Sequence, residues 1–475
     1  MAAGRRARLT EAIANRRGSC TMGAIHSNAC DSVITGGRAL AVALDQLLPQ
    51  ACDVVVVGGG IAGLATAYEL AGAGLSVVLC EKGRIAGEQS SRAFGWVSNL
   101  GLDPIKMELT QLSKRLWRDL ADQLGHERLG YRQGGLMHLC HDEVQLAGEQ
   151  AWLAAVQGHG VEAQLLSSRE LAAHVPGCSR RFAGALYQGC DGRVEPEQAS
   201  AALAEAARGR GARLFAPCAV RGIERSAGAV SAVVTERGRI RCSQVVLAGG
   251  AWSRLFCGNA GLYLPQLAIH SSLVRIAPLA GGPTANAHAP GYAFRRHADG
   301  GYVLGPTSGH GALITRDSFE LLLTFLPALR NQWRQMKVKF GKAFFDDLKV
   351  PRRWALDEVS PFERQRMLDP QPDMALNLQT LANMAAEFPA LREARVVEHW
   401  AGMIDATPDS VPVISAVGSV PGLYLNTGYS AYGLTMAPAG ARLLGELMTG
   451  RQPSIDGHAY RYSRFIDGSK LRVAP

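Results

Sequence analysis

Three glycines after a short apolar run are the residues of this sequence with the clearest chemical use. Gly58, Gly60 and Gly63 follow the β-branched run 53–57 and precede the helical pattern 64–71. In such an order the first glycine permits a tight turn, the second opens the backbone to a phosphate, and the third lets helix and strand pack closely. The pattern predicts a pyrophosphate-binding turn at the positive end of a helix.

A carboxylate follows at the distance that a dinucleotide requires. Residues 75–80 form a second strand-like run that ends at Glu81, 23 residues after Gly58. A carboxylate there can accept hydrogen bonds from both ribose hydroxyls of an adenosine. Because strand, turn, helix, second strand and acid occur in this order, we expect a dinucleotide site rather than a purely structural glycine turn.

The loop after this acid indicates which dinucleotide is bound. Residues 82–98 are rich in glycine and hydroxyl side chains, which suits a segment that runs along an extended cofactor. Residues 87–95, with Ser90-Ser91-Arg92 at their centre, resemble the second flavin-contacting loop of the D-amino-acid oxidase and sarcosine oxidase family of FAD enzymes. The resemblance implies FAD as the cofactor, whereas an enzyme that binds only NAD would have no use for this loop.

Three later segments extend the resemblance to about residue 450. Residues 212–220 resemble the strand whose last residue contacts the adenine end of FAD, 244–253 resemble the strand and glycine turn that return to the dinucleotide, and 423–435 resemble the loop that closes over the flavin. Together the glycine motif and the resemblance imply that FAD contacts Gly58, Gly60, Ile61, Ala62, Gly63, Glu81, Lys82, Ser90, Ser91, Arg92, Val220, Ala248, Gly249, Trp252, Gly428, Gly433, Leu434 and Thr435.

The last part of that loop has a chemical purpose of its own. Apolar residues recur at helical spacing over 434–447, so a helix beginning near Gly433 would point its N-terminus at the flavin. A flavin that accepts a hydride develops negative charge, which a helix N-terminus stabilises. Relatives attach FAD through a histidine in the early loop or a cysteine near the C-terminus. This chain has neither, so we expect non-covalent FAD.

The resemblance also implies the type of reaction. Members of the family take a hydride onto flavin N5 from a C–H next to an amine nitrogen of an amino acid, imino acid or related amine, and water hydrolyses the imine. Oxygen, a quinone or a partner subunit would then accept the electrons. One alternative is the FAD subunit of a hetero-oligomeric dehydrogenase of the opine or hydroxyproline type. Another is a flavoprotein with mainly structural FAD that binds a partner.

The residues that would hold the substrate are less evident. His270 lies within the apolar run 264–276, which we expect to pass the flavin face, although a lone histidine in a strand is more often structural. Aromatic side chains that could line an apolar pocket are Trp96, Tyr429 and Tyr432. The catalytic candidates are therefore His270, Tyr429 and Arg92.

The carboxylate anchors of the family are missing from their usual positions. Sarcosine-oxidase-like members carry a lysine where this chain has Thr435, and some D-amino-acid dehydrogenases carry an arginine near Met403 and Ile404. Either another arginine binds the substrate carboxylate, or the substrate lacks a simple α-carboxylate. The possible substitutes are Arg92, Arg295 and Arg296.

The motifs predict an α/β fold with a Rossmann-like FAD-binding domain, and the resemblance implies that this domain is interleaved with a substrate domain built on a mainly antiparallel sheet. Strand-like patterns with turn glycines, such as 136–140 and 301–304, would form that second sheet. We expect a leader or disordered extension over 1–50, a discontinuous FAD-binding domain over 51–135, 190–262 and 396–475, and a substrate domain over 136–189 and 263–395.

One segment of the substrate domain stands apart. Between 318 and 348, apolar residues recur at helical spacing with lysines and arginines beside them. We expect a helical insertion packed on the substrate sheet. The alternative is a basic amphipathic helix on an anionic membrane, which would suit a dehydrogenase that reduces a quinone.

Composition excludes several other classes of protein. The chain has 475 residues, 47% of them hydrophobic, and a net charge of +9. Much of that excess lies in the first fifty residues, which could be a transit peptide, a disordered tail or the product of an early start codon, so nucleic-acid binding is not expected. The ten cysteines lack metal-site spacing and no run of about 18 apolar residues occurs. We expect a metal-free cytoplasmic protein, at most peripheral to the inner membrane.

Overall fold

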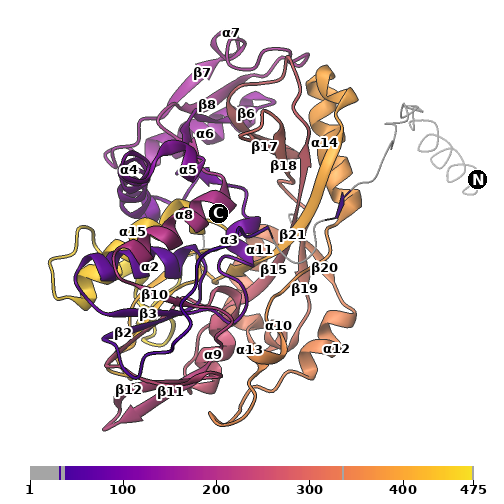
Figure 1. Ribbon diagram of the computed structural model, residues 1–475. Helices are drawn as coiled ribbons and strands as arrows, with labels where there is room; N and C mark the ends of the chain where they lie inside the picture. The colour runs from indigo at the N-terminus through magenta and orange to yellow at the C-terminus, as the bar shows by residue number, and fades with distance from the viewer. Residues whose placement is uncertain (1–31, 34–37, 334–335, 473–475) are drawn as a thin grey trace, which may run out of the picture. The chain divides into compact units, whose positions relative to one another are not determined.

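The computed structural model describes residues 32–33, 38–333 and 336–472. Two large sheets dominate this part of the chain, one of six strands and one of eleven. Their combination confirms the expected α/β class with a Rossmann-like sheet and a second, mainly antiparallel sheet. Figure 1 shows the smaller sheet at the lower left, and the larger sheet extending from the top down the right-hand side, with helices around them.

The six-stranded sheet is buried on both faces. Val54 and Val56 belong to the hydrophobic cluster on one face, whereas Val55 and Val57 belong to the cluster on the other. This explains why the strand is a continuous valine run rather than an alternating one. All neighbouring strands are parallel except the last pair. In spatial order they are β10 (Arg213–Phe215), β3 (Val77–Cys80), β2 (Val54–Val57), β14 (Gln244–Leu247), β23 (Leu423–Thr427) and β22 (Val413–Ala416).

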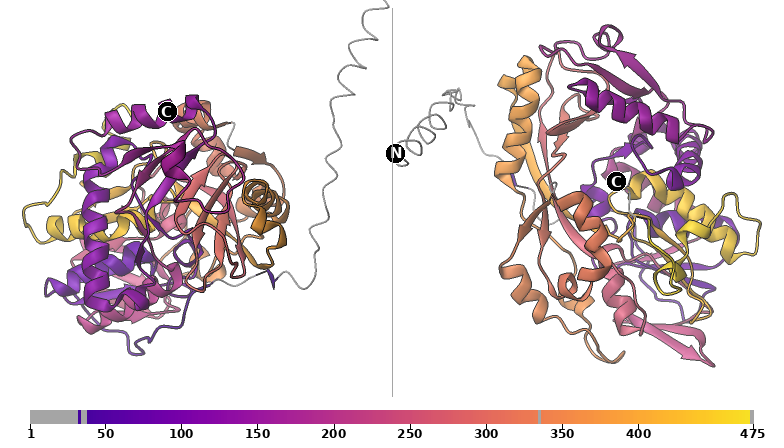
Figure 2. Two further views of the ribbon diagram at one scale, coloured as in Figure 1. Left: turned by 90° about the horizontal axis from the view of Figure 1, so that it is seen from above. Right: turned by 180° about the vertical axis from the view of Figure 1, so that it is seen from behind.

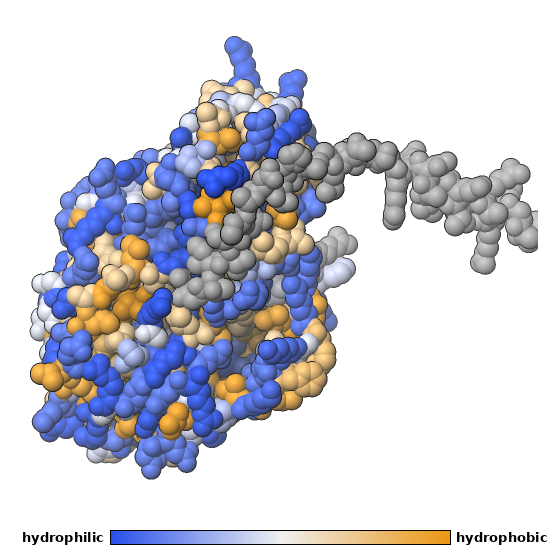
Figure 3. Space-filling view, turned by 45° about the vertical axis from the view of Figure 1, so that its right-hand side comes forward, coloured by the Kyte–Doolittle hydropathy of each residue, from blue (hydrophilic) through white to orange (hydrophobic). Residues whose placement is uncertain are grey.

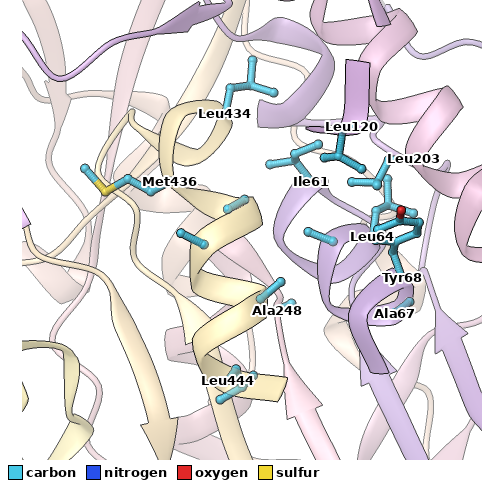
Figure 4. Packing of buried hydrophobic residues seen from close by; sticks show 14 of the residues in the cluster. Ile61, Leu64, Ala67, Tyr68, Leu120, Leu203, Ala248, Leu434, Met436 and Leu444 are labelled. Carbon is cyan, nitrogen blue, oxygen red and sulfur yellow. The ribbon is translucent and has the colours of Figure 1, made fainter. Parts of the chain in front are cut away.

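Helices cover one face of this sheet, and a small antiparallel sheet covers the other. Helix α15 packs along α2, and Figure 4 shows Ile61 of α2 on the side that α15 occupies, with Leu64 beside Leu203 of α8. The helices on this face are α2 (Ile61–Gly72), α4 (Met107–Leu124), α5 (His126–Leu129), α8 (Pro196–Gly209) and α15 (Gly433–Met448). The opposite face carries β11 (Val220–Ser226), β12 (Ala229–Thr235), β13 (Gly238–Arg241) and α9 (Ser253–Asn259).

The larger sheet is mixed, with antiparallel pairs in the majority. Its main path runs β1 (Ser32–Val33), β21 (Val396–Ala406), β15 (Leu267–Ile276), β18 (Tyr302–Gly305), β17 (Tyr292–Arg296), β16 (Asn286–Ala289), β6 (Leu136–Cys140), β8 (Gly184–Gln188) and β7 (Gln164–Ser167). Strands β19 (His310–Leu313) and β20 (Met336–Lys339) branch from β15.

One face of the larger sheet packs against α14 (Met374–Glu387). Leu381 and Met384 of this helix join the cluster that contains Val274, Phe294 and Leu304. Figure 2 shows α14, in orange, along the outer side of the sheet. Because side chains alternate along a strand, the residues next to these three in sequence face the opposite side, toward the smaller sheet.

Shorter elements connect the two sheets. A three-stranded sheet consists of β4 (Trp96–Val97), β9 (Gly192–Arg193) and β5 (Arg132–Gln133). The remaining helices are α3 (Gln89–Arg92), α6 (Glu143–Ala155), α7 (Ser168–Leu171), α10 (Arg316–Glu320), α11 (Leu322–Gln332), α12 (Lys342–Leu348) and α13 (Pro361–Arg364).

Two expected boundaries differ from the structure. Strand β21 lies in the larger sheet, although its residues begin the last segment that we expected in the FAD-binding domain. Residues 38–50 do not behave as a disordered extension: Asp45 exchanges hydrogen bonds with Leu214, and Arg38 forms ion pairs with Glu197 and Glu398. The rest of the expected leader, 1–31 and 34–37, lies outside the described residues.

The insertion over 318–348 is not simply helical. Helices α10, α11 and α12 are interrupted by β20, whose Met-Lys-Val-Lys sequence pairs in parallel with β19. An alternating apolar and basic pattern at a sheet edge favours a strand, and helical spacing over the whole segment was therefore a wrong interpretation. None of the helices in the described part of the chain has the length and apolarity needed to cross a bilayer.

Candidate active site

The glycine turn after β2 lines a cavity at the carboxyl end of the smaller sheet. Gly58 has φ +111°, and a side chain there would collide with the carbonyl oxygen of Ala248. A Cβ at Gly63 would lie 1.9 Å from the carbonyl oxygen of Gly58, so only glycine permits this helix–strand contact. At Gly60 a Cβ would meet only the Ser90 hydroxyl, at 3.0 Å, and would otherwise extend into the cavity.

Glu81 stands at the end of β3 in the wall of the same cavity. Its Oε2 accepts a hydrogen bond from the Gly59 amide and its Oε1 accepts one from the Gly83 amide, each at 2.7 Å. Burial raises the pKa of Glu81, while the neighbouring Lys82 and these two amides act in the opposite direction. The two amides orient the carboxylate, and its remaining lone pairs stay available for the hydroxyls of a ribose.

Most of the residues expected to contact FAD lie around this cavity. Lys82 extends over the ring of Trp252, 4.1 Å from its centroid, and also pairs with Glu88. Gly63, Ser91 and Gly428 are the expected residues that line neither this cavity nor the next one. The expected residues in the wall of the first cavity are Gly58, Gly60, Ile61, Ala62, Glu81, Lys82, Ser90, Val220, Ala248, Gly249, Trp252 and Gly433.

A second cavity of about 790 Å³ lies between the two sheets and adjoins the first. Both cavities are lined by Ile61, Gln89, Ser90 and Gly433, so they meet where α2 and α15 begin. No described side chain caps α15, whereas the Ile61 amide at the start of α2 donates to the Ser90 hydroxyl at 2.8 Å. The positive ends of two helices therefore point at the junction of the cavities.

The residues present fit FAD. The first cavity has the glycine turn, the ribose-binding carboxylate and the open backbone at Gly60 that a dinucleotide needs. At the junction, helix α15 begins at Gly433, and both Leu434 and Thr435 line the second cavity. The Thr435 hydroxyl donates to the carbonyl oxygen of Trp96 at 3.0 Å, which ties this helix start to the loop of 82–98.

Two of the three catalytic candidates lie away from the second cavity. On β15, Ser271 and Leu273 line it, so His270 points to the other face, where its Nε2 lies 2.8 Å from the carbonyl oxygen of Gln371. Tyr429 is 4% exposed, and its hydroxyl donates to Asn426 Oδ1 at 2.5 Å within the helical core. His270 is therefore structural at this position, which corrects the sequence-based expectation, whereas Tyr429 lines the first cavity and not the second.

The three candidate arginines have different surroundings. Arg295 is 2% exposed and pairs with Glu195 through Nη1 at 2.9 Å and Nη2 at 2.8 Å. Arg296 lines neither cavity. Arg92 lines the second cavity, and its Nη1 contacts the carbonyl oxygen of Ala401 and a carboxylate oxygen of Asp369, each at 2.9 Å. Its Nε and Nη2 have no hydrogen-bond partner among the described residues.

Sequence reasoning missed several polar residues in the walls of these cavities. Asp405 of β21 lines the first cavity, 2% exposed, and its Oδ2 accepts the Gly428 amide at 2.9 Å. An acid in the apolar second half of this strand was the available signal. His138, Glu149 and His288 line the second cavity and carried no such signal. Within the described residues, no group of three or more His, Cys, Asp or Glu side chains could hold a metal ion.

Asp405 predicts a pH-dependent difference in stability. Burial raises its pKa from 3.8 to about 6, so the folded protein binds this proton more tightly than the unfolded chain does. The contribution of Asp405 to the free energy of unfolding is therefore complete below pH 4, where the carboxyl group is protonated in both states. It is lost as the pH rises to 6, where the folded protein must release this proton. Asp405→Asn should match the wild type at pH 4 and exceed it by about 3 kcal/mol at pH 7. Urea unfolding from pH 4 to 8 measures this, and parallel curves for the two proteins would contradict it.

Comparisons with known proteins agree with this geometry. A model of the family described as FAD-dependent oxidoreductase (DAO) matches residues 53–447. The L-amino acid deaminase of Proteus myxofaciens, solved in complex with anthranilate, is 36% identical with a TM-score of 0.87, covering 90% of this chain and 97% of that one. The L-amino acid deaminase of Proteus vulgaris is 34% identical with a TM-score of 0.85, covering 90% of this chain and 100% of that one.

A relative with a different printed activity matches at lower identity. The glycine oxidase of Pseudomonas aeruginosa is 30% identical over 84% of this chain and 96% of its own length. The relatives of this chain thus include oxidases and deaminases of amino acids, and FAD is the cofactor that the family shares. From the glycine turn, the two adjoining cavities and these matches, we conclude that the chain belongs to the DAO family of FAD-dependent oxidoreductases.

Proposed function

We propose that this enzyme oxidatively deaminates L-α-amino acids with long side chains. The observation that carries the proposal is the second cavity, which opens onto the cofactor cavity at the start of α15 and has Arg92 in its wall. Two L-amino acid deaminases, each more than 30% identical over 90% of this chain, support the enantiomer. The volume of about 790 Å³ supports a substrate larger than glycine.

FAD, when bound, supplies the acceptor for a hydride from the α-carbon, and water hydrolyses the resulting imine to a 2-oxo acid and ammonia. The protein's own contributions are electrostatic and steric. The uncapped N-terminus of α15 stabilises negative charge at the junction of the cavities. Phe94, Trp96 and Leu273 give the second cavity apolar walls, which exclude water from the reacting carbon.

Arg92 is the residue that we propose to bind the substrate carboxylate. A guanidinium group can bind a carboxylate through two parallel hydrogen bonds, which fixes orientation as well as position. The contacts of Nη1 with Ala401 and Asp369 hold the group in place, while Nε and Nη2, on one edge of the guanidinium, are buried and have no partner among the described residues. These two donors match the spacing of two carboxylate oxygens.

Anaerobic reduction of the bound flavin tests the proposed reaction. L-amino acids with long side chains should bleach the flavin band at about 450 nm faster than their D-enantiomers, glycine or N-methylglycine do. The panel should include opines and hydroxyproline, because rapid bleaching by these alone would favour the alternative of a hetero-oligomeric dehydrogenase. A flavin that no L-amino acid bleaches would contradict the proposal.

Arg92→Lys tests the carboxylate anchor separately. Lysine keeps the charge but cannot form the bidentate pair, so KM for L-leucine should rise roughly 10- to 100-fold with a smaller change in kcat. The matched substrate is 3-methylbutylamine, which is leucine without its carboxylate, and its slow oxidation should be unchanged. Equal losses for both substrates would mean that Arg92 positions the flavin instead of the substrate.

We further propose that electrons pass to a quinone in a membrane that this protein contacts peripherally. Residues 316–349 contain seven Lys or Arg and four acidic residues. Phe319 is 62% exposed, Leu323 83% and Val338 67%. Figure 3 shows apolar residues, in orange, reaching the surface among hydrophilic ones on this side of the molecule. Exposed apolar groups beside an excess of basic groups suit an anionic lipid surface.

Vesicles of anionic phospholipid that contain ubiquinone test this proposal. Wild type should sediment with anionic vesicles but not with zwitterionic ones, and the quinone should reoxidise the flavin faster than dissolved oxygen does. Leu323→Glu should weaken sedimentation, whereas Leu47→Glu, at an 81% exposed position outside this segment, should not. Fast reoxidation by oxygen alone, without vesicle binding, would indicate an oxidase.

A further inference from the structure

The floor of the second cavity is a single row of residues across the larger sheet. His138 of β6 pairs with His288 of β16, His288 pairs with Ala293 of β17, and Ala293 pairs with Gly305 of β18. Val274 of β15 pairs with Leu304, which places Leu273 beside Gly305. Residues opposite each other in neighbouring strands share a face, and all five line the cavity.

This row makes the cavity a long trough. Four steps between neighbouring strands, each of about 4.8 Å, separate Leu273 from His138 by roughly 19 Å. Ala293 and Gly305, in the middle of the row, leave its centre open. Helix α6 lies across β6 and β8, and its Glu149 and Trp152 line the cavity above the far end. The trough extends well beyond the region next to the cofactor.

The two ends of the trough carry opposite charges. Among the described residues that line it, Arg92 is the only lysine or arginine and Glu149 is the only carboxylate. Arg92 packs against Gly402 of β21, at the cofactor end of the row. Glu149 lies at the other end, where its Oε1 is 3.0 Å from Nδ1 of His138. The ends are thus complementary to a ligand with an anion at one end and a hydrogen-bond donor at the other.

Neighbouring groups at the far end can accept a hydrogen bond from such a donor. The rings of His138 and His288 are 5.1 Å apart between centroids. Burial lowers the pKa of His288 to about 3, with a smaller effect from His138, so its imidazole is neutral and can accept a hydrogen bond. Gln145 of α6 also lines this end. One carboxylate and one neutral imidazole form an acceptor-rich subsite.

We infer that this far end is a second substrate subsite, which binds a cationic N–H donor, an ammonium or a guanidinium, at the end of an extended side chain. The inference rests on the proposed function, because it assumes that the α-carboxylate is held near Arg92 and the α-carbon near the cofactor. It narrows the substrate class to L-amino acids whose long side chains end in a positive charge.

Flavin reduction with matched substrates tests the inference. Wild type should show a kcat/KM for L-arginine at least 10-fold above that for L-citrulline, which has the same shape without the charge. Glu149→Gln should abolish that preference. Glu143→Gln, on the same helix but exposed and outside the cavity, should behave as wild type. A wild type that oxidises norleucine and citrulline as well as arginine would overturn the inference and leave the proposed function intact.

Binding without turnover separates the two proposals. The probe is 5-guanidinopentanoate, which has the carboxylate and guanidinium of arginine but no α-amine to oxidise. Calorimetry should show tighter binding than for hexanoate, with the difference lost in Glu149→Gln and kept in Glu149→Asp. If this pattern appears while no amino acid bleaches the flavin, the subsite stands and the proposed function fails. Equal affinities of the two probes in a folded wild type would overturn the subsite.

Discussion

The arrangement of the site depends on two helices whose N-termini meet at one edge of a parallel sheet. Helix α2 can begin there because Gly63 touches the backbone of Gly58 at a distance that no other residue permits. Helix α15 lies against α2, so its start at Gly433 reaches the same place. The uncapped start of α15 and the aligned dipoles of both helices then favour negative charge at the point where the two cavities join.

The site also requires a surface that faces the junction of the two cavities, and the larger sheet supplies it. Its strands alternate between an apolar face covered by α14 and a face that lines the trough. The same alternation explains why Phe294 and Leu304 belong to the core while Ala293 and Gly305 form the floor. A cation near the helix starts and a carboxylate across the sheet make the space polar at both ends and apolar between them.

Local patterns were sufficient for the cofactor half of the site and insufficient for the substrate half. The glycine turn, Glu81 and the helix from Gly433 are each short local motifs, and the function of each follows from neighbours within one turn or strand. His270 was misplaced because a period of two does not reveal which face of a strand meets a cavity. The insertion was misread because helical spacing in 318–348 coexists with a strand pattern at Met336–Lys339.

The sequence by itself determined the fold class, the family, FAD as the cofactor and most of the residues around the cofactor cavity, because these depend on short motifs with fixed backbone geometry. Only the tertiary structure decided that Arg295 pairs with Glu195, while Arg92 has two buried donors without a partner among the described residues. It also decided that Glu149 stands opposite Arg92. Such pairings join residues far apart in the chain, and strand order and register determine them.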